Sequence, residues 1–116
     1  MNLTTENANG IAVVRVGESR LMYPLLSEFS SAVTQLIATG ERRVVVNLSS
    51  VGYVDSATIG CLMDLYRQAA AAGGSLKLAG VQKRVESMLT MTGAQDVLEI
   101  HADEPSAIKS FGSNGK

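Results

Sequence analysis

The sequence predicts one α/β domain with a mixed, mostly parallel β-sheet, an N-terminal hairpin and about four helices. A chain of 116 residues is long enough for one compact domain and too short for two. Strand-like segments alternate with segments of helical periodicity, an order typical of parallel strands joined by helices. The predicted order is β-β-α-β-α-β-α-β-α, with the domain at residues 1–111 and a flexible tail at 112–116.

The chain is predicted to begin with a hairpin at one side of the sheet. Leu3–Glu6 is a candidate short strand, and Asn9-Gly10 is a turn signal because both residues tolerate a positive φ angle. The β-branched segment Ile11–Val16 supplies the second strand. Gly17–Pro24 is then expected to be a loop, with its proline suited to the first turn of a helix.

Helices and strands then alternate along the rest of the chain. Apolar residues recur at helical spacing before Gly40 and again between Ser56 and Gly73. The first apolar stripe comprises Leu25, Leu26, Phe29, Val33, Leu36 and Ile37, and the second comprises Ile59, Leu62, Met63, Tyr66, Ala69 and Ala70. The other predicted elements are strands at Arg43–Leu48, Ser75–Ala79 and Val97–Ile100 and helices at Gln82–Thr92 and Asp103–Phe111. Arg43–Leu48 is nearly all apolar, which predicts a strand covered on both faces, and Asp103 is an expected N-cap.

The charge and cysteine content exclude several classes of function. Ten basic and eleven acidic residues give a formal net charge of −1, so nucleic acid, which requires a surplus of Lys and Arg, is not the expected partner. A single cysteine, Cys61, excludes a disulfide framework and a multi-cysteine metal site and indicates a reducing compartment. No apolar run approaches the roughly 18 residues of a membrane span, and the polar start is unlike a signal peptide. We therefore expect a cytoplasmic protein without membrane insertion, metal or cofactor.

The most informative segment is Val44–Leu65, in which a strand leads through a short connection into Asp55-Ser56 at the start of a helix. Open α/β sheets bind ligands beyond the carboxyl ends of their strands. Free backbone N–H groups and the helix dipole favour a negative charge there, so a phosphate on the Ser56 hydroxyl would be tolerated. The simpler interpretation is that Asp55 or Ser56 is only the N-cap of the helix, a position where both residue types are common.

Three segments carry a family resemblance. Asp55-Ser56-Ala57-Thr58-Ile59-Gly60 follows a strand, as does the motif D-S-[SA]-G-[LI]-G. Ala71–Leu78 is similar to A-G-G-x-L-x-L, and Val81–Val85 with Leu89–Gly93 matches a helix that ends in L-x-x-T-G. With these segments in order and correctly spaced, residues 10–110 resemble the STAS domain, named for sulphate transporters and anti-sigma factor antagonists, in its small stand-alone bacterial form.

The resemblance implies regulation of transcription by partner switching rather than an enzymatic activity. In anti-sigma factor antagonists of this family, a serine kinase that is also the anti-sigma factor phosphorylates the serine after the motif aspartate, which corresponds to Ser56. The unphosphorylated form binds the kinase and frees the sigma factor, and the phosphorylated form is released. A phosphatase is a second candidate partner, and the oligomeric state stays open. The expected partner-binding residues are Leu21, Met22, Tyr23, Asp55, Ser56, Ala57, Thr58 and Ile59.

Two departures from the family pattern keep a second interpretation open. Gly17–Tyr23 lacks the aspartate of the family's G-x-L-D segment. Thr58, whose β-branch is expected to obstruct a kinase, replaces the motif glycine. Both favour a constitutive STAS subunit of a lipid-transport ATPase or a stress-signalling scaffold, which binds without phosphorylation. Leu21, Met22 and Tyr23 are either a docking patch beside Ser56 or apolar packing at the entry to the first helix.

An enzyme with Cys61 or Ser56 as nucleophile is a third interpretation, for which the sequence offers no nearby base and no oxyanion motif. Cys61 is expected to be a small core residue, although a thiol near a helix start can be acidified. His101, the only histidine, is expected at the surface without a partner. Lys83-Arg84 and Glu41-Arg42-Arg43 are predicted to be solvated charges, with partner contact by Lys83-Arg84 as the less favoured alternative.

Overall fold

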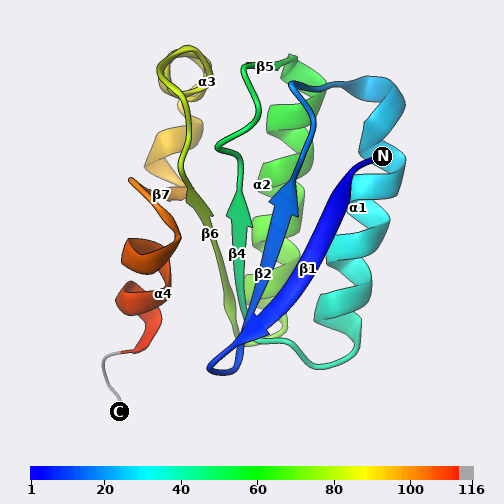
Figure 1. The fold of residues 1–116 in the computed structure, drawn as a ribbon, viewed down its shortest axis with the longest axis vertical. Coiled ribbons are helices and arrows are strands. Elements are labelled where there is room, and N and C mark those ends of the chain that lie inside the picture. Colours follow the sequence, from blue (N-terminus) through cyan, green and yellow to red (C-terminus); the bar gives the residue numbers. More distant parts are fainter. Residues whose placement is uncertain (113–116) are drawn as a thin grey trace.

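A five-stranded sheet in the order β1-β2-β4-β6-β7 forms the centre of the computed structural model, which describes residues 1–112 (Figure 1). Its strands are β1 (Leu3–Ala8), β2 (Ile11–Val16), β4 (Arg43–Asn47), β6 (Ser75–Ala79) and β7 (Glu99–His101). The first two strands pair antiparallel, and all the other neighbours pair parallel. The predicted α/β class, the N-terminal hairpin and the mostly parallel sheet are therefore confirmed.

Helices cover both faces of the sheet. α1 (Tyr23–Ala38) and α2 (Ser56–Ala71) pack against each other on one face, and α4 (Glu104–Gly112) packs on the other (Figure 1). α3 (Lys83–Met91) follows β6, and the 3-10 helix η1 (Ala94–Asp96) leads from α3 to β7. None of the helices described is long and apolar enough to cross a membrane. Of the tail predicted at 112–116, Gly112 ends α4, and 113–116 lie outside the described residues.

Alternating side chains on the central strand β4 explain the two cores. Val44, Val45 and Val46 are all fully buried. Val44 and Val46 belong to the larger core under α1 and α2, whereas Val45 packs with Ala107 of α4. Successive side chains of a strand point to opposite faces, so an unbroken apolar strand requires cover on both sides, as its sequence predicted.

Two further strands were not predicted. β3 (Arg20–Leu21) and β5 (Tyr53–Val54) form a separate parallel pair. β3 lies in the segment expected to be a loop, where a pairing of two residues is too short to give a periodic pattern. The last strand begins at Glu99 rather than at Val97, because the Val97 N–H closes η1 by donating to the Ala94 carbonyl oxygen at 3.0 Å.

Candidate functional site

The segments that follow β2 and β4 meet at the carboxyl edge of the sheet. There β3 and β5 pair in parallel, with Arg20 opposite Tyr53 and Leu21 opposite Val54. β3 leads into α1 and β5 leads into α2, at the upper edge of the sheet in Figure 1. The pairing therefore brings the apolar segment Leu21–Tyr23 beside the motif at 55–60, although the two are far apart in the sequence.

Asp55 fixes the beginning of α2. Its Oδ1 accepts a hydrogen bond from the Thr58 N–H at 2.9 Å, and its Oδ2 accepts one from the Tyr23 N–H at 3.2 Å. The carboxylate thus connects the starts of two helices. The hydrogen bond from the Thr58 side chain is the main cause that holds the pKa of Asp55 below its usual value. The N-cap is therefore Asp55, and the Ser56 hydroxyl is not used for capping.

Thr58 lies beneath the surface. Its side chain is fully buried, and its hydroxyl oxygen is 2.6 Å from the Leu21 carbonyl oxygen and 2.7 Å from Asp55 Oδ1. The single hydroxyl proton can be donated to only one of these two oxygens at a time. The expectation that the β-branch of Thr58 obstructs a kinase is wrong, because the side chain points inward. Leu21 and Ile59 are also buried, so these three residues support the surface in this fold rather than form it.

The other five predicted partner-binding residues reach the surface. The Ser56 surface consists of these five residues, Met22, Tyr23, Asp55, Ser56 and Ala57. Tyr23 is 75 % exposed, Ser56 and Ala57 are exposed, and the other two are partly exposed. Leu21 thus packs in the core, whereas Tyr23 projects into solvent, so the three apolar residues of this segment divide between packing and surface.

An apolar groove adjoins the Ser56 surface. It has a volume of about 510 Å³ and lies between the first two turns of α1 and of α2, with Tyr23, Ala57 and Cys61 among its lining residues. Ser56 is the first residue of α2, where the positive end of the helix dipole favours a negative charge. An exposed hydroxyl therefore stands beside a surface that can receive apolar side chains.

Cys61 and His101 lie on opposite faces of the sheet and form no catalytic pair. Cys61 is half-buried against the larger core, and burial raises the pKa of its thiol, whereas a nucleophile requires a lowered pKa. His101 is aligned with Asn47 and Ala79 on the α4 face, and its Nε2 lies 2.7 Å from Glu99 Oε1. The expectation that His101 has no partner is therefore wrong, and its side chain is only partly exposed. Among residues 1–112, no group of three or more His, Cys, Asp and Glu is placed to hold a metal ion.

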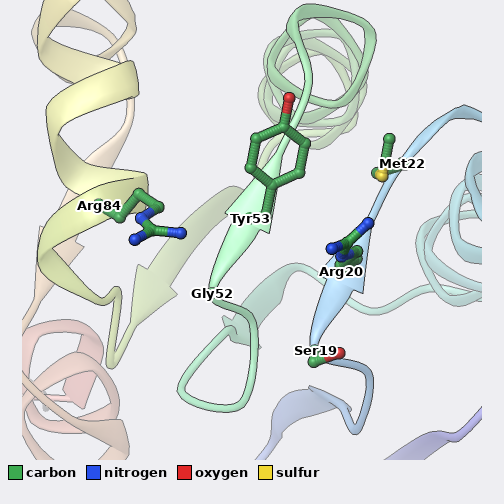
Figure 2. Close-up of a pocket in the computed structure, with 6 residues that line it drawn as sticks. All are labelled: Ser19, Arg20, Met22, Gly52, Tyr53 and Arg84. Atoms are coloured by element: carbon green, nitrogen blue, oxygen red, sulfur yellow. The ribbon is translucent and has the colours of Figure 1, made fainter.

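A second pocket beside the Ser56 surface was missed by sequence reasoning. Figure 2 shows Arg84 of α3 on one side of Tyr53, and Arg20 with Met22 on the other. The pocket has a volume of about 430 Å³ and is also lined by Ser19 and Gly52. The sequence marked Arg84 as a charge, but only the short β3–β5 pairing brings Arg20 and Tyr53 together.

The model of the STAS domain family matches residues 2–107 of the chain. Among curated proteins, the chain is similar to an anti-sigma-B factor antagonist of Staphylococcus aureus. The two are 25 % identical over 101 residues, which cover 87 % of this chain and 93 % of the relative. The match therefore extends over nearly the whole length of both proteins.

Solved structures share the fold. An anti-sigma-factor antagonist (STAS) domain protein from Planctomyces limnophilus superposes with a TM-score of 0.87 at 16 % identity, covering 96 % of this chain and 98 % of that one. The anti-sigma factor antagonist SpoIIAA in its unphosphorylated form gives a TM-score of 0.80 at 18 % identity, covering 95 % and 96 %. The Bacillus protein SpoIIAA in the phosphorylated form gives 0.73 at 17 % identity, covering 96 % and 100 %.

Proposed function

Because the chain belongs to the STAS domain family, we propose that it is an anti-sigma factor antagonist switched by phosphorylation of Ser56. Its unphosphorylated form binds a serine-kinase anti-sigma factor through the Ser56 surface, and the phosphorylated form is released. The observation that carries the proposal is the exposed Ser56 at the first position of α2, with the N-cap supplied by Asp55. Two similar proteins support the proposal. The Staphylococcus aureus relative is named an anti-sigma-B factor antagonist, and SpoIIAA, which shares the fold, has been solved in a phosphorylated form.

Phosphorylation is expected to change binding far more than folding. A phosphate adds about −1.5 to −2 charges at neutral pH. On the exposed first residue of α2 it stays hydrated and interacts with the helix dipole by about 0.3–1 kcal/mol, part of which the neighbouring Asp55 carboxylate offsets. In an interface the same group must be desolvated, and like charges there cost several kcal/mol. Phosphorylation is therefore expected to dissociate the complex with the anti-sigma factor without unfolding the antagonist.

The exposed Tyr23 and the neighbouring groove provide the apolar part of the contact. Tyr23 is 75 % exposed and lines the groove together with Ala57, which directly follows Ser56. Aromatic side chains at the centre of an interface contribute a large share of its binding energy. A partner that covers Tyr23 and Ala57 also covers Ser56, so the phosphate is added at the contact itself.

The test combines phosphate mapping with binding measurements. Incubation with the purified cognate serine-kinase anti-sigma factor and ATP is expected to place phosphate on Ser56, located by mass spectrometry. Ser56→Asp is expected to weaken kinase binding by about tenfold or more, or about 1.4 kcal/mol, while Ser56→Ala binds like wild type and resists release. Ser106→Asp is the matched control, because Ser106 is an exposed serine in the first turn of α4, on the opposite face of the sheet.

Two results would contradict the proposal: no phosphate on Ser56, or equal kinase affinity for Ser56→Asp and wild type. Co-purification with a transport ATPase subunit, unaffected by Ser56→Asp, would instead select a constitutive binding subunit. Because the Thr58 side chain is buried, the steric argument drawn from it no longer favours this alternative, whereas the missing aspartate of the Gly17–Tyr23 segment still does.

A further inference from the structure

The pocket between β3, β5 and α3 presents two arginines whose charges are not neutralised within the described chain. Arg20 and Arg84 are both exposed, and neither takes part in the ion pairs that residues 1–112 form. Figure 2 shows them on either side of Tyr53, with the Arg84 guanidinium reaching from α3 toward β5. Two guanidinium groups around a pocket of about 430 Å³ attract an anion.

The position of Arg84 is not explained by helix stability. Arg84 is the second residue of α3, where the positive end of the helix dipole disfavours a cation. Gln82, the N-cap, makes no side-chain capping bond, and its side-chain amide N–H donates instead to the Ser49 carbonyl oxygen at 2.7 Å. Glu86 lies in the same turn but forms no ion pair with Arg84 among the described residues. Lys83, the first residue of α3, is a cation in the same turn, but only Arg84 lines the pocket, where an anionic partner would offset its charge.

The pocket is continuous with the Ser56 surface. Met22 belongs to both, and Tyr53 is separated from Ser56 only by Val54 and Asp55. A partner that covers the Ser56 surface and extends past Met22 therefore also covers the pocket and excludes water from it. The exclusion of water matters because exposed guanidinium–carboxylate pairs are weakened by water and salt, whereas covered pairs form strong and directional hydrogen bonds.

We propose that Arg20 and Arg84 together bind an Asp or Glu side chain of the anti-sigma factor, with Tyr53 packed against the same side chain. The inference rests on the proposed function and names the chemistry of the partner at this point. Each planar guanidinium presents N–H donors spaced to match a carboxylate, and the Tyr53 ring contacts methylene groups. A partner with a neutral or basic residue at this point would leave both arginines desolvated without a counter-charge. The pocket therefore discriminates between related kinases.

The test measures the dissociation constant for the purified serine-kinase anti-sigma factor by calorimetry. Arg20→Glu and Arg84→Glu are each expected to weaken binding by about tenfold or more, and the double variant further. Wild-type affinity is expected to fall more steeply with added NaCl than the affinity of the double variant. Arg42→Glu is the matched control, because Arg42 is exposed at the amino end of β4, at the opposite edge of the sheet. Melting curves followed by circular dichroism separate lost binding from lost folding.

Each outcome decides the inference. If wild type and the double variant bind the kinase equally, the pocket assignment is overturned and the proposed function stands. If wild type does not bind at all, both are overturned. An Asp→Arg or Glu→Arg change on the kinase that restores binding of Arg84→Glu supports the assignment and identifies the counter-charge. Saturable binding of inorganic phosphate at Arg20 and Arg84, without any effect on kinase affinity, overturns it in favour of a small-anion site.

Discussion

The two faces of the five-stranded sheet are covered by different kinds of contact. On the face under α1 and α2, the central strands contribute only apolar side chains, namely Ala12, Val14, Val16, Val44, Val46, Leu76 and Leu78. On the α4 face, neighbouring strands also contribute Arg15, Asn47, Lys77, Glu99 and His101. The comparison indicates that hydrophobic burial holds α2, which presents Ser56, whereas polar contacts hold much of α4. Loss of an apolar side chain and loss of a charge should therefore affect the two faces differently.

The polar contacts of the α4 face converge on two side chains. Glu104, the first residue of α4, accepts hydrogen bonds from Arg15 Nε at 2.7 Å and from the Asn47 amide. Lys77 is buried, and its Nζ donates to Ser110 Oγ at 2.6 Å and lies 3.2 Å from the Glu99 carboxylate. The ammonium group also lies 4.2 Å from the centre of the Phe111 ring. A buried cation is tolerated here because several partners satisfy it.

The largest effect is expected on the apolar face. Leu62 of α2 is fully buried, so Leu62→Ala should lower the free energy of unfolding by about 3–5 kcal/mol, measured by urea denaturation. Ile108→Ala on α4 is the matched control. Because Ile108 is only partly buried, its loss should cost less, about 1–2 kcal/mol. Equal losses would mean that hydrophobic burial does not distinguish the two faces.

An intermediate effect is expected at Thr58, the buried polar side chain on the apolar face. Thr58→Val keeps the shape but removes the hydroxyl that lies within hydrogen-bond distance of the Leu21 carbonyl oxygen and Asp55 Oδ1, which should cost about 1–2 kcal/mol. It should also raise the pKa of Asp55, because the Thr58 hydrogen bond is the main cause of its lowering. Urea denaturation and NMR titration of the Asp55 carboxyl measure the two effects.

Thr34→Val is the control for Thr58→Val, because the Thr34 hydroxyl also donates a hydrogen bond, to Gln68 Oε1, but its side chain is exposed. This control should change the free energy of unfolding by no more than about 0.5 kcal/mol. If Thr58→Val leaves the pKa of Asp55 unchanged, the hydroxyl does not hold the carboxylate as the structure indicates.

Much of the fold was predictable because apolar periodicity decides which side of an element is buried. The nearly all-apolar segment Arg43–Leu48 predicted a strand that is covered on both faces of the sheet. Asp103 caps α4 as expected, because its side chain accepts a hydrogen bond from the Ser106 N–H at 2.9 Å. The predicted stripe of α2 included Ala70, which is exposed, and omitted Leu65, which is fully buried. Periodicity locates a helical stripe but does not give its width, which depends on how α1 and the sheet enclose α2.

The site was predictable in part. The motif placed Ser56 at a helix start, and the structure resolved the choice of N-cap in favour of Asp55. The burial of Thr58 was not predictable, because its hydroxyl is satisfied by a carbonyl oxygen of β3, which no local pattern indicates. The arginine pocket was missed for the same reason, since its three elements are brought together only by tertiary pairing.

The smallest effect is expected for a charge on the α4 face. Glu104→Gln keeps the shape and removes the charge that pairs with the partly exposed Arg15, so at pH 7 it should cost about 1 kcal/mol or less. The effect should depend on pH, because the Arg15 hydrogen bond is the main cause that holds the pKa of Glu104 below its usual 4.5. A carboxyl group whose pKa is lower in the folded state stabilises the fold fully above its usual pKa. That contribution is lost as the pH falls through the lower value.

The difference in unfolding free energy between wild type and Glu104→Gln should therefore be constant above pH 4.5 and shrink as the pH falls below it. Urea denaturation at a series of pH values measures this difference. Glu86→Gln, at an exposed residue of α3, is the control and should give a much smaller difference throughout. A Glu104→Gln difference that stays constant down to the acid transition would mean that shape rather than charge holds α4 at this point. The two faces would then differ in composition but not in the kind of force that covers them.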